Sequence, residues 1–245
     1  MRKHVVKVSA IYPDSKSLSD LANEKAYCGL SLSNPNYTSD RLKAVLQFMV
    51  MNFKNPVAIT TGYLYRYHYQ MYGYNYDEAL NLALKKENEH FRKELIPTLE
   101  SGGVSEVEII RWDSISKNEE FMINLNKINK FYDECCEFKN KIDEVALNFL
   151  NAKAKDIVGS FENAKKLSIN FLLEESAFFD YLALKGYRVD VYPGTALPAL
   201  RDMSKYANAP EGLKDRVAIE ILIKRSGRKK KVKITEKQES LSMEN

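Results

Sequence analysis

Short apolar runs alternate along the chain with longer segments in which apolar positions recur every three or four residues. The short runs are rich in β-branched residues and predict buried strands over Val5–Ser9, Ala26–Ser31, Val57–Thr61, Val107–Trp112 and Arg188–Tyr192. The longer segments predict amphipathic helices around Leu42–Phe53 and over Tyr76–Ser101, Glu119–Leu150 and Leu167–Leu182. The Gly102-Gly103 pair is a stop signal for the second of these helices.

Strands separated by helices of this length favour right-handed crossovers, and so a parallel sheet flanked by helices. We therefore expect a single Rossmann-like α/β domain over residues 1–223, followed by an extension over residues 224–245. In such sheets the ligand site lies at the carboxyl ends of the strands, near the point where the strand order reverses. The loops after the strands are where chemistry is expected.

The charge of the chain is concentrated at one end. The 245 residues carry a net charge of only +4, yet the run from 224 to 233 contains Lys224, Arg225, Arg228, Lys229, Lys230, Lys231 and Lys233. Such a segment indicates a polyanionic partner, either a nucleic acid or an anionic membrane surface, unless it is simply a solvated basic tail.

The cysteines and the hydropathy pattern exclude other classes of protein. Three cysteines, two of them adjacent, give neither a disulfide framework nor a zinc-binding spacing. No stretch reaches the roughly 18 apolar residues of a membrane span. We expect a monomeric cytoplasmic protein with no metal and no cofactor.

A serine follows the second expected strand, in the segment Cys28-Gly29-Leu30-Ser31-Leu32-Ser33-Asn34. A strand-to-helix turn can present a serine outward as a nucleophile, Gly29 lets the backbone bend there, and nearby amides can stabilise an oxyanion. The alternative is a helix cap. No histidine stands in a convincing place to act as the base, so we expect Ser31 to have a different proton partner.

A glutamate lies on the apolar face of the 167–182 helix. Three or four residues from Glu175 stand Phe171, Leu172, Phe178 and Phe179. Apolar neighbours raise the pKa of a carboxyl group, as proton exchange near neutrality requires. Glu174 shares part of this face, and a carboxylate paired with a lysine is the alternative.

Tyrosines are concentrated between residues 63 and 76, where seven occur together with Arg66 and His68. They can stack on unpaired bases at the end of an RNA strand, or simply pack beneath a loop. The fifth strand ends in Tyr192-Pro193-Gly194, a turn that would hold Tyr192 at the carboxyl edge of the sheet.

Together these positions resemble the tRNA-dependent cyclodipeptide synthases, whose fold is similar to the catalytic domain of class I aminoacyl-tRNA synthetases. The resemblance covers most of residues 25–195. It rests on Gly29-Leu30-Ser31 with Asn34, Leu46-Gln47, Leu99-Glu100-Ser101, the Leu173–Phe179 segment and Tyr192-Pro193. Pro193 is typical of the Tyr-Pro subgroup, which usually lacks an asparagine where Asn34 stands.

The resemblance implies that two aminoacyl-tRNAs are joined into a 2,5-diketopiperazine by a ping-pong route through an aminoacyl-enzyme on Ser31. Glu175 then corresponds to the acid/base that holds the amine, and Tyr192 to a tyrosine that contacts the aminoacyl group. A further tyrosine of the family's site is Phe171 here, so its hydroxyl must be replaced elsewhere. Tyr27 and Phe178 are expected to line the first aminoacyl pocket, and their bulk favours a small side chain such as alanyl.

An aminoacyl-tRNA is an activated ester, so no ATP site is needed. The phosphate backbone of the tRNA gives the basic residues a role; the candidate contacts are Lys85, Lys86, Arg92, Lys93, Arg228, Lys229, Lys230 and Lys231. Two other functions remain open. A serine hydrolase of small esters would use the Ser31 turn without tRNA, and a non-catalytic tRNA-binding module would need neither Ser31 nor Glu175.

Overall fold

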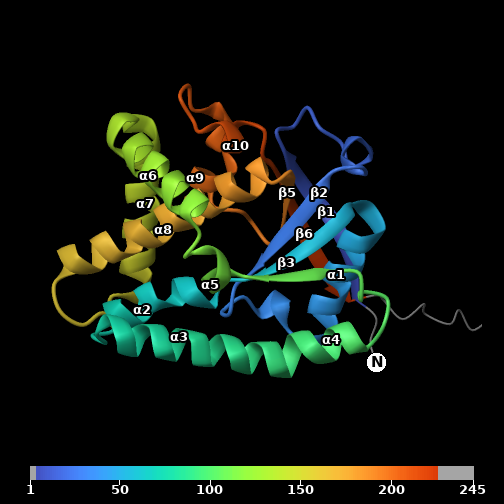
Figure 1. Ribbon diagram of the computed structural model, residues 1–245, viewed down its shortest axis with the longest axis horizontal. Coiled ribbons are helices and arrows are strands. Elements are labelled where there is room, and N and C mark those ends of the chain that lie inside the picture. The colour runs from blue at the N-terminus through green and yellow to red at the C-terminus, as the bar shows by residue number, and fades with distance from the viewer. Residues whose placement is uncertain (1–3, 226–245) are drawn as a thin grey trace, which may run out of the picture.

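A six-stranded sheet forms the centre of the computed structural model, which describes residues 4–225 (Figure 1). Its strands are β1 (His4–Tyr12), β2 (Lys25–Leu30), β3 (Lys54–Thr60), β4 (Glu108–Arg111), β5 (Tyr187–Pro193) and β6 (Val217–Arg225). They lie in the order β1-β6-β5-β2-β3-β4, and every neighbouring pair is parallel except β1 with β6. The expected parallel sheet is therefore present, with one antiparallel strand at its edge.

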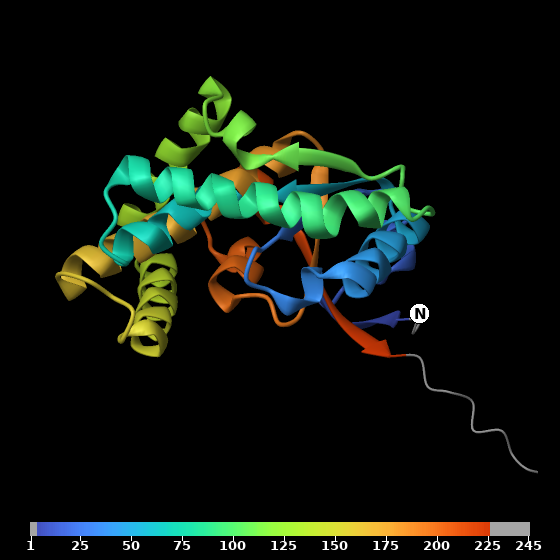
Figure 2. The same cartoon turned by 90° about the horizontal axis from the view of Figure 1, so that it is seen from below.

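Helices cover both faces of this sheet (Figures 1 and 2). The α-helices are α1 (Ser39–Asn52), α2 (Arg66–Met71), α3 (Tyr76–His90), α4 (Ile96–Glu100), α5 (Trp112–Ile115), α6 (Glu119–Glu134), α7 (Cys136–Lys153), α8 (Phe161–Leu184), α9 (Pro198–Arg201) and α10 (Glu211–Lys214). Short 3-10 turns span Ser19–Leu21, Pro35–Tyr37, Gly62–Tyr65 and Met203–Lys205. Within residues 4–225, no helix is both long and apolar enough to cross a bilayer.

The alternation of side chains along the strands divides the core into two layers. Tyr27 and Ile59 pack on one face of the sheet with apolar residues of α6 and α8. Cys28 and Ala58 pack on the other face with residues of α1. Asp190 and Tyr192 alternate with the buried Val189 and Val191 of the second layer, which places them on the α8 side.

The strand order reverses between β2 and β5. From β2 the sheet grows through β3 to β4, whereas β5 lies on the other side of β2 and is followed by β6. Tyr27 of β2 is paired with Asp190 of β5, and both strands run in the same direction. The loops that leave these two strands diverge, which opens a crevice at the carboxyl edge.

Strand β6 was not among the strands expected from the sequence, and it continues past the expected domain boundary at residue 223. Lys224 and Arg225 therefore belong to the sheet, where Arg225 is paired with His4 of β1. The other basic residues of the expected extension, including Arg228, Lys229, Lys230 and Lys231, lie outside the described residues. The apolar run Val217–Ile223 carried the signal for this strand.

The single helix expected over Glu119–Leu150 is wrong, because the chain breaks at Cys135 into α6 and α7. Because of the break, the ring centroids of Phe131 and Phe138 are only 4.8 Å apart, and the ring centroid of Phe138 lies 5.6 Å from that of Tyr206. In an unbroken helix residues seven apart are about 10 Å apart along the axis. The helix expected over Tyr76–Ser101 is continuous, but it has one π-helical turn at Phe91–Leu95.

Candidate active site

A cavity of about 580 Å³ opens at the reversal point of the sheet, between the loops after β2 and β5 and the helices α7 and α8. Six of the eight catalytic and substrate-binding candidates line it: Gly29, Ser31, Phe171, Glu175, Phe178 and Tyr192. Further lining residues include Ser33, Tyr65, His68, Trp112, Asp190 and Arg216. The fold therefore brings together segments that are far apart in the sequence.

Ser31 is the first residue after β2, and its hydroxyl faces the hydroxyl of Tyr65 at 2.9 Å. Ser33 lies beside it, with its hydroxyl 2.7 Å from the same phenol oxygen and its backbone amide donating to that oxygen at 2.9 Å. Among the described residues, no histidine makes a hydrogen bond to Ser31. The expectation of a proton partner other than histidine therefore agrees with the geometry.

The backbone around Ser31 differs from the expected turn in two respects. Gly29 lies within β2, paired with Ile59, so the chain turns only after it. Gly29 is also part of the cavity wall, so a larger side chain at this position would change the shape of the cavity. The amide of Ser33, one of the expected oxyanion donors, is bonded to Tyr65.

Glu174 and Glu175 have different environments in α8. Glu174 is buried in an ion pair with Arg66 and also accepts hydrogen bonds from Tyr67 at 2.8 Å and from Trp112 at 3.3 Å. Glu175 lines the cavity. Burial, together with the negative charge of Asp190, raises the pKa of Glu175 to about 7, although the positive charge of Arg216 opposes the shift. Of the two carboxyl groups, Glu175 alone has the setting of a proton-exchanging group.

Tyr192 stands near the end of β5 and lines the same cavity as Ser31. Burial raises the pKa of its phenol, and the charges of Glu175 and Asp190 add to this effect. Asn34 is not part of the cavity wall. It caps the 3-10 turn by accepting from the amide of Asn36 at 2.9 Å, and its own amide donates to the carbonyl of Pro193 at 3.4 Å. Asn34 therefore joins the two loops that carry Ser31 and Tyr192.

Tyr27 lies beneath the cavity and is not part of its lining. Its ring is fully buried, and its hydroxyl accepts a hydrogen bond from Arg216 Nε at 2.9 Å. Arg216 also forms an ion pair with Asp190. Phe178, in contrast, lines the cavity and is stacked on Trp112 with 3.8 Å between ring centroids. Of the two residues expected to line the aminoacyl pocket, Phe178 lines the cavity and Tyr27 does not. Trp112, Asp190 and Arg216 line it as well.

Phe171 is one of three stacked rings in the cavity wall. His68 lies between Phe171 and Phe149, 5.0 Å from each ring centroid. Burial lowers the pKa of His68 to about 4, with contributions from the charges of Lys86 and Lys153. The imidazole is therefore neutral at pH 7, and it brings hydrogen-bonding atoms to the side of the cavity where Phe171 has none.

Four of the basic residues expected to contact tRNA lie in the described part of the chain, where all four are exposed and one, Lys86, is close to the cavity. Lys85 and Lys86 lie on α3, and Arg92 and Lys93 lie on the π-helical turn that follows. Lys86 Nζ stands 5.3 Å from the ring centroid of Tyr65. Lys93 makes an exposed ion pair with Glu89 at 3.7 Å. Lys86 therefore connects the basic side of α3 to the cavity wall.

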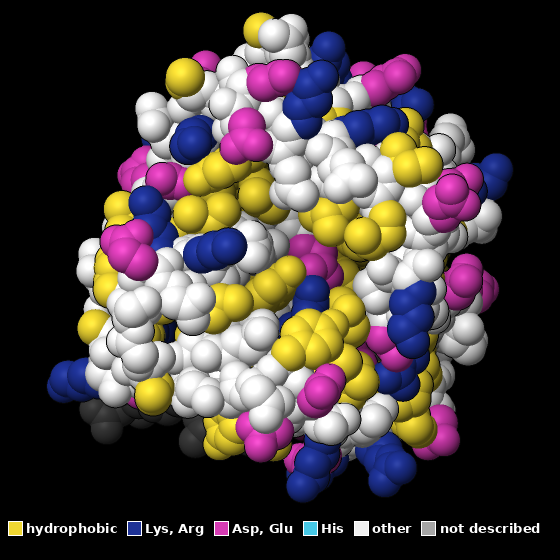
Figure 3. Space-filling model, turned by 60° about the vertical axis from the view of Figure 1, so that its left-hand side comes forward, with side chains coloured by type: hydrophobic (Ala, Val, Ile, Leu, Met, Phe, Trp, Pro, Cys, Tyr) yellow, Lys and Arg dark blue, Asp and Glu magenta, His cyan; other side chains and the backbone are white. Residues whose placement is uncertain are grey.

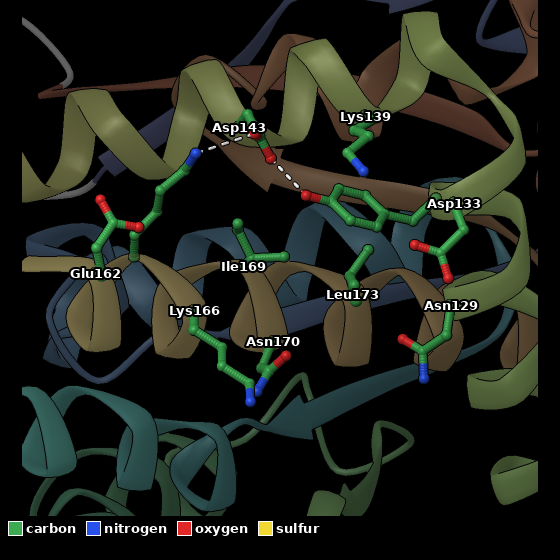
Figure 4. A pocket seen from close by; sticks show the side chains of 11 residues that line it. Asn129, Asp133, Lys139, Asp143, Glu162, Lys166, Ile169, Asn170 and Leu173 are labelled. Carbon is green, nitrogen blue, oxygen red and sulfur yellow. Dashed lines mark hydrogen bonds and ion pairs between the residues drawn. The ribbon is translucent and has the colours of Figure 1, made fainter.

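A second hollow lies between α6, α7 and α8 (Figure 4). Its polar groups bond to one another, because Asp143 accepts from Tyr132 at 2.5 Å and pairs with Lys165 at 3.1 Å. No residue expected from the sequence to be catalytic, substrate-binding or tRNA-binding lines this hollow. On the molecular face shown in Figure 3, acidic and basic side chains are mixed around apolar groups, without a large area of one sign.

Several cavity residues were missed by sequence reasoning. Tyr65 belongs to the noted tyrosine cluster, but nothing in that cluster distinguishes it from its six neighbours. Asp190 lies two residues before Tyr192 in a strand whose other residues are mostly apolar, and a charged residue in a buried strand is a usable signal. Arg216 precedes the unpredicted strand β6, so its position could not be assigned.

Known proteins were compared with this chain by sequence and by structure. A family model described as cyclodipeptide synthase matches residues 17–181. No curated protein matches the sequence. The solved structure of a cyclodipeptide synthase from Fluoribacter dumoffii is 17% identical with a TM-score of 0.77, over 92% of this chain and 100% of that chain. The synthase from Candidatus Glomeribacter gigasporarum, solved bound to Phe-tRNAPhe, is 17% identical with a TM-score of 0.62, over 90% and 96%.

A tyrosyl-tRNA synthetase from Aeropyrum pernix is also similar in fold, with 11% identity and a TM-score of 0.54 over 88% of this chain and 58% of that chain. The architecture is thus the Rossmann-like α/β fold shared with class I aminoacyl-tRNA synthetases. Within this class, the chain belongs to the cyclodipeptide synthase family of enzymes, whose model matches well over half of its length.

Proposed function

We propose that this enzyme joins the aminoacyl groups of two aminoacyl-tRNAs into a cyclic dipeptide, with Ser31 as the nucleophile. The observation that supports this most directly is that Ser31, Glu175 and Tyr192 line one cavity at the carboxyl edge of the sheet. The substrate already carries an activated ester, so the site needs only a nucleophile, a proton-exchanging group and a dry pocket.

In the first step Ser31 Oγ attacks the ester carbonyl and expels the 3′-terminal ribose hydroxyl, which leaves an aminoacyl-enzyme. The amine of the second aminoacyl-tRNA then attacks this acyl group and releases Ser31. The resulting dipeptidyl-tRNA closes when its own free amine attacks the remaining ester, which releases the second tRNA. Each step forms one acyl bond and breaks another, so no outside source of energy is required.

Glu175 is proposed to hold the amine of the first aminoacyl group and to exchange protons with the attacking amines. A pKa of about 7 suits this role, because the carboxylate can both take up and return a proton near neutrality. Tyr192 is proposed to contact the aminoacyl group from the opposite loop. His68 is our candidate for the hydrogen-bonding group that Phe171 lacks.

The tRNA is proposed to contact α3 and the adjoining π-helical turn through Lys85, Lys86, Arg92 and Lys93. Lys86 supports this arrangement, because its ammonium group lies 5.3 Å from the ring centroid of Tyr65, which lines the cavity. The extension beyond Arg225, with Arg228, Lys229, Lys230 and Lys231, is proposed as a second contact. Asn34 bonded to Pro193 is compatible with the Tyr-Pro subgroup, which we retain as part of the proposal.

Two alternative functions make different demands on the site. A serine hydrolase would need a base beside Ser31, where the described residues place only the hydroxyls of Tyr65 and Ser33. A non-catalytic tRNA-binding module would not need Glu175 beside a serine in a shared cavity. Neither alternative accounts for the presence of Ser31 and a carboxyl group of raised pKa in the same cavity.

Incubation of the protein with tRNA that carries a radiolabelled aminoacyl group tests the proposal. Label should remain on the wild-type protein after denaturation and should be lost in Ser31→Ala. Mass spectrometry of the same reaction should find a cyclic dipeptide. Retention unaffected by Ser31→Ala would refute the assignment of the nucleophile, and turnover of simple esters without tRNA would favour the hydrolase.

A further inference from the structure

The hydroxyl of Tyr65 contacts three polar groups of the loop that carries Ser31. It lies 2.9 Å from Ser31 Oγ, 2.7 Å from Ser33 Oγ and 2.9 Å from the amide nitrogen of Ser33. The two serine hydroxyls are themselves 3.4 Å apart. All three hydroxyl groups line the same cavity.

The number of hydrogen bonds at the phenol oxygen fixes how they are directed. A phenol oxygen donates one hydrogen bond and accepts at most two. The amide of Ser33 can only donate, so it takes one of the two acceptor positions. Tyr65 must therefore donate to one serine and accept from the other. When it accepts from Ser31, the proton of Ser31 points at Tyr65 and a lone pair of Oγ is free to attack.

The ring of Tyr65 is held in place from several sides. The 3-10 turn Gly62–Tyr65 is fixed by the buried Glu87, which accepts from the amide of Gly62 at 3.0 Å. A Cβ at Gly62 would lie 2.4 Å from the Cβ of Glu87, so this approach requires glycine. The rings of Tyr65 and His68 pack edge to face, with 5.0 Å between their centroids. The phenol is thus a preorganised partner for the serine.

We propose that Tyr65 is a further catalytic residue, which relays the proton of Ser31 to Ser33 during formation of the aminoacyl-enzyme. This inference rests on the proposed role of Ser31 as nucleophile. As the Oγ–carbonyl bond forms, the Ser31 proton passes to Tyr65, the Tyr65 proton passes to Ser33, and the Ser33 proton passes to the departing ribose oxygen. The bond between the carbonyl carbon and the ribose oxygen breaks at the same time. Tyr65 and Ser33 each lose one proton and gain another, whereas Ser31 loses its proton and becomes acylated.

The burial of the three groups agrees with this direction of transfer. Ser31 is partly buried, Tyr65 is buried, and Ser33 is exposed at the rim of the cavity. The aminoacyl group must enter the pocket, whereas the ribose of the large tRNA must stay at its mouth. A relay that ends on Ser33 delivers the proton where the leaving group departs, without requiring a histidine.

Tyr65→Phe tests the relay, with Tyr63→Phe as the matched control. Tyr63 lies on the same turn, and its hydroxyl bonds only to that of Tyr76 at 3.3 Å among the described residues. In single-turnover acylation by aminoacyl-tRNA, Tyr65→Phe should be slower by about 100-fold and Ser33→Ala by about 10-fold, while Tyr63→Phe keeps the wild-type rate. Thermal melting checks that each variant is folded.

Acylation rates in mixtures of H2O and D2O separate a relay from a merely structural role. Several protons moving together give a rate that bends downward as the deuterium fraction rises, and Tyr65→Phe should remove this curvature. An acylation rate of Tyr65→Phe equal to that of wild type, or the same curvature in both proteins, would overturn the inference.

A fluorophosphonate that labels serine nucleophiles separates this inference from the proposed function, because it needs no tRNA. Its reaction with Ser31 should be at least about 10-fold slower in Tyr65→Phe than in Tyr63→Phe. If this holds but no aminoacyl-enzyme forms from tRNA, Tyr65 activates Ser31 and the proposed function is wrong. Equal labelling of the two variants would contradict the role of Tyr65.

Discussion

Glu174 and Glu175 are adjacent in α8, yet one is locked in a buried ion pair with Arg66 and the other faces the cavity. Successive positions of a helix are turned by about 100°, which is enough to separate a structural carboxylate from a reactive one. The two residues therefore offer a matched pair of substitutions at almost the same place in the chain.

The first prediction is that Glu174→Gln destabilises the fold and Glu175→Gln does not. Removing the charge of Glu174 leaves Arg66 buried without its counter-ion, which costs roughly 3–5 kcal/mol of unfolding free energy. Glu175 has a folded pKa of about 7, above its usual value of 4.5, so its ionised form is unfavourable in the folded state. This penalty is absent below pH 4.5 and complete above pH 7.

Glu175→Gln should accordingly stabilise the protein by roughly 3 kcal/mol at pH 8 and have a much smaller effect at pH 5. Urea denaturation at the two pH values measures both variants. A destabilised Glu175→Gln at pH 8 would show that the carboxylate has a stabilising partner that we have not recognised.

The second prediction concerns the rate at which the aminoacyl-enzyme reacts with the second aminoacyl-tRNA. It should rise with pH through about 7, because ionised Glu175 is the form that accepts a proton from the attacking amine. Rapid-quench assays between pH 5.5 and 9 give this profile. His68→Asn should keep the transition, because the pKa of His68 is about 4 and the ring is already neutral there.

The third prediction is that Asp190→Asn moves this transition to lower pH. The negative charge of Asp190 raises the pKa of Glu175, and its removal also leaves the positive charge of Arg216 uncompensated. Both effects favour the carboxylate. The amine of the substrate also titrates near neutrality, but its pKa in free solution does not change with this substitution. An unshifted profile would assign the transition to the amine.

The fourth prediction concerns tRNA affinity. Changing Lys85, Lys86, Arg92 and Lys93 to Gln should weaken tRNA binding. The slope of log K against log salt concentration should become less steep by about 0.7–0.9 for each lost phosphate contact. Filter binding across a range of salt concentrations measures this slope. Deletion of residues 226–245 should have a similar effect, and it leaves Lys224 and Arg225 in β6.

A deletion that leaves both affinity and slope unchanged would identify the end of the chain as a solvated tail. Acylation at saturating tRNA should survive the deletion, because Ser31 and Glu175 lie elsewhere. Loss of acylation under these conditions would instead give the extension a part in the chemistry.

The fifth prediction is that a small residue such as alanine occurs in the main product. Phe178 and Trp112 are stacked and fully buried side by side at the cavity, which limits its width there. Reaction with a mixture of charged tRNAs, followed by mass spectrometry, identifies the product. A main product without a small residue would refute the size argument.

The parts of the site that depend on local pattern were predictable from the sequence. Ser31 follows an apolar strand and Glu175 has apolar neighbours three and four residues away, so periodicity made both of them candidates. The resemblance to the cyclodipeptide synthases was needed to prefer Glu175 to Glu174 and a nucleophile to a helix cap. Tyr65 was not predictable as a partner of Ser31, because its role depends on how a short turn docks against the end of β2. The break at Cys135 was missed because the apolar period continues across it.

The reversal of strand order between β2 and β5 also means that the cavity is built from an early and a late part of the chain. Ser31 leaves the ribosome early, whereas Tyr192 and Arg216 come from the last part of the described chain. Until β5 docks beside β2, one edge of β2 is unpaired and the pocket has no second wall. An unfinished chain therefore lacks the cavity wall that Tyr192 and Arg216 supply, and the proposed reaction of Ser31 with charged tRNA requires the completed sheet.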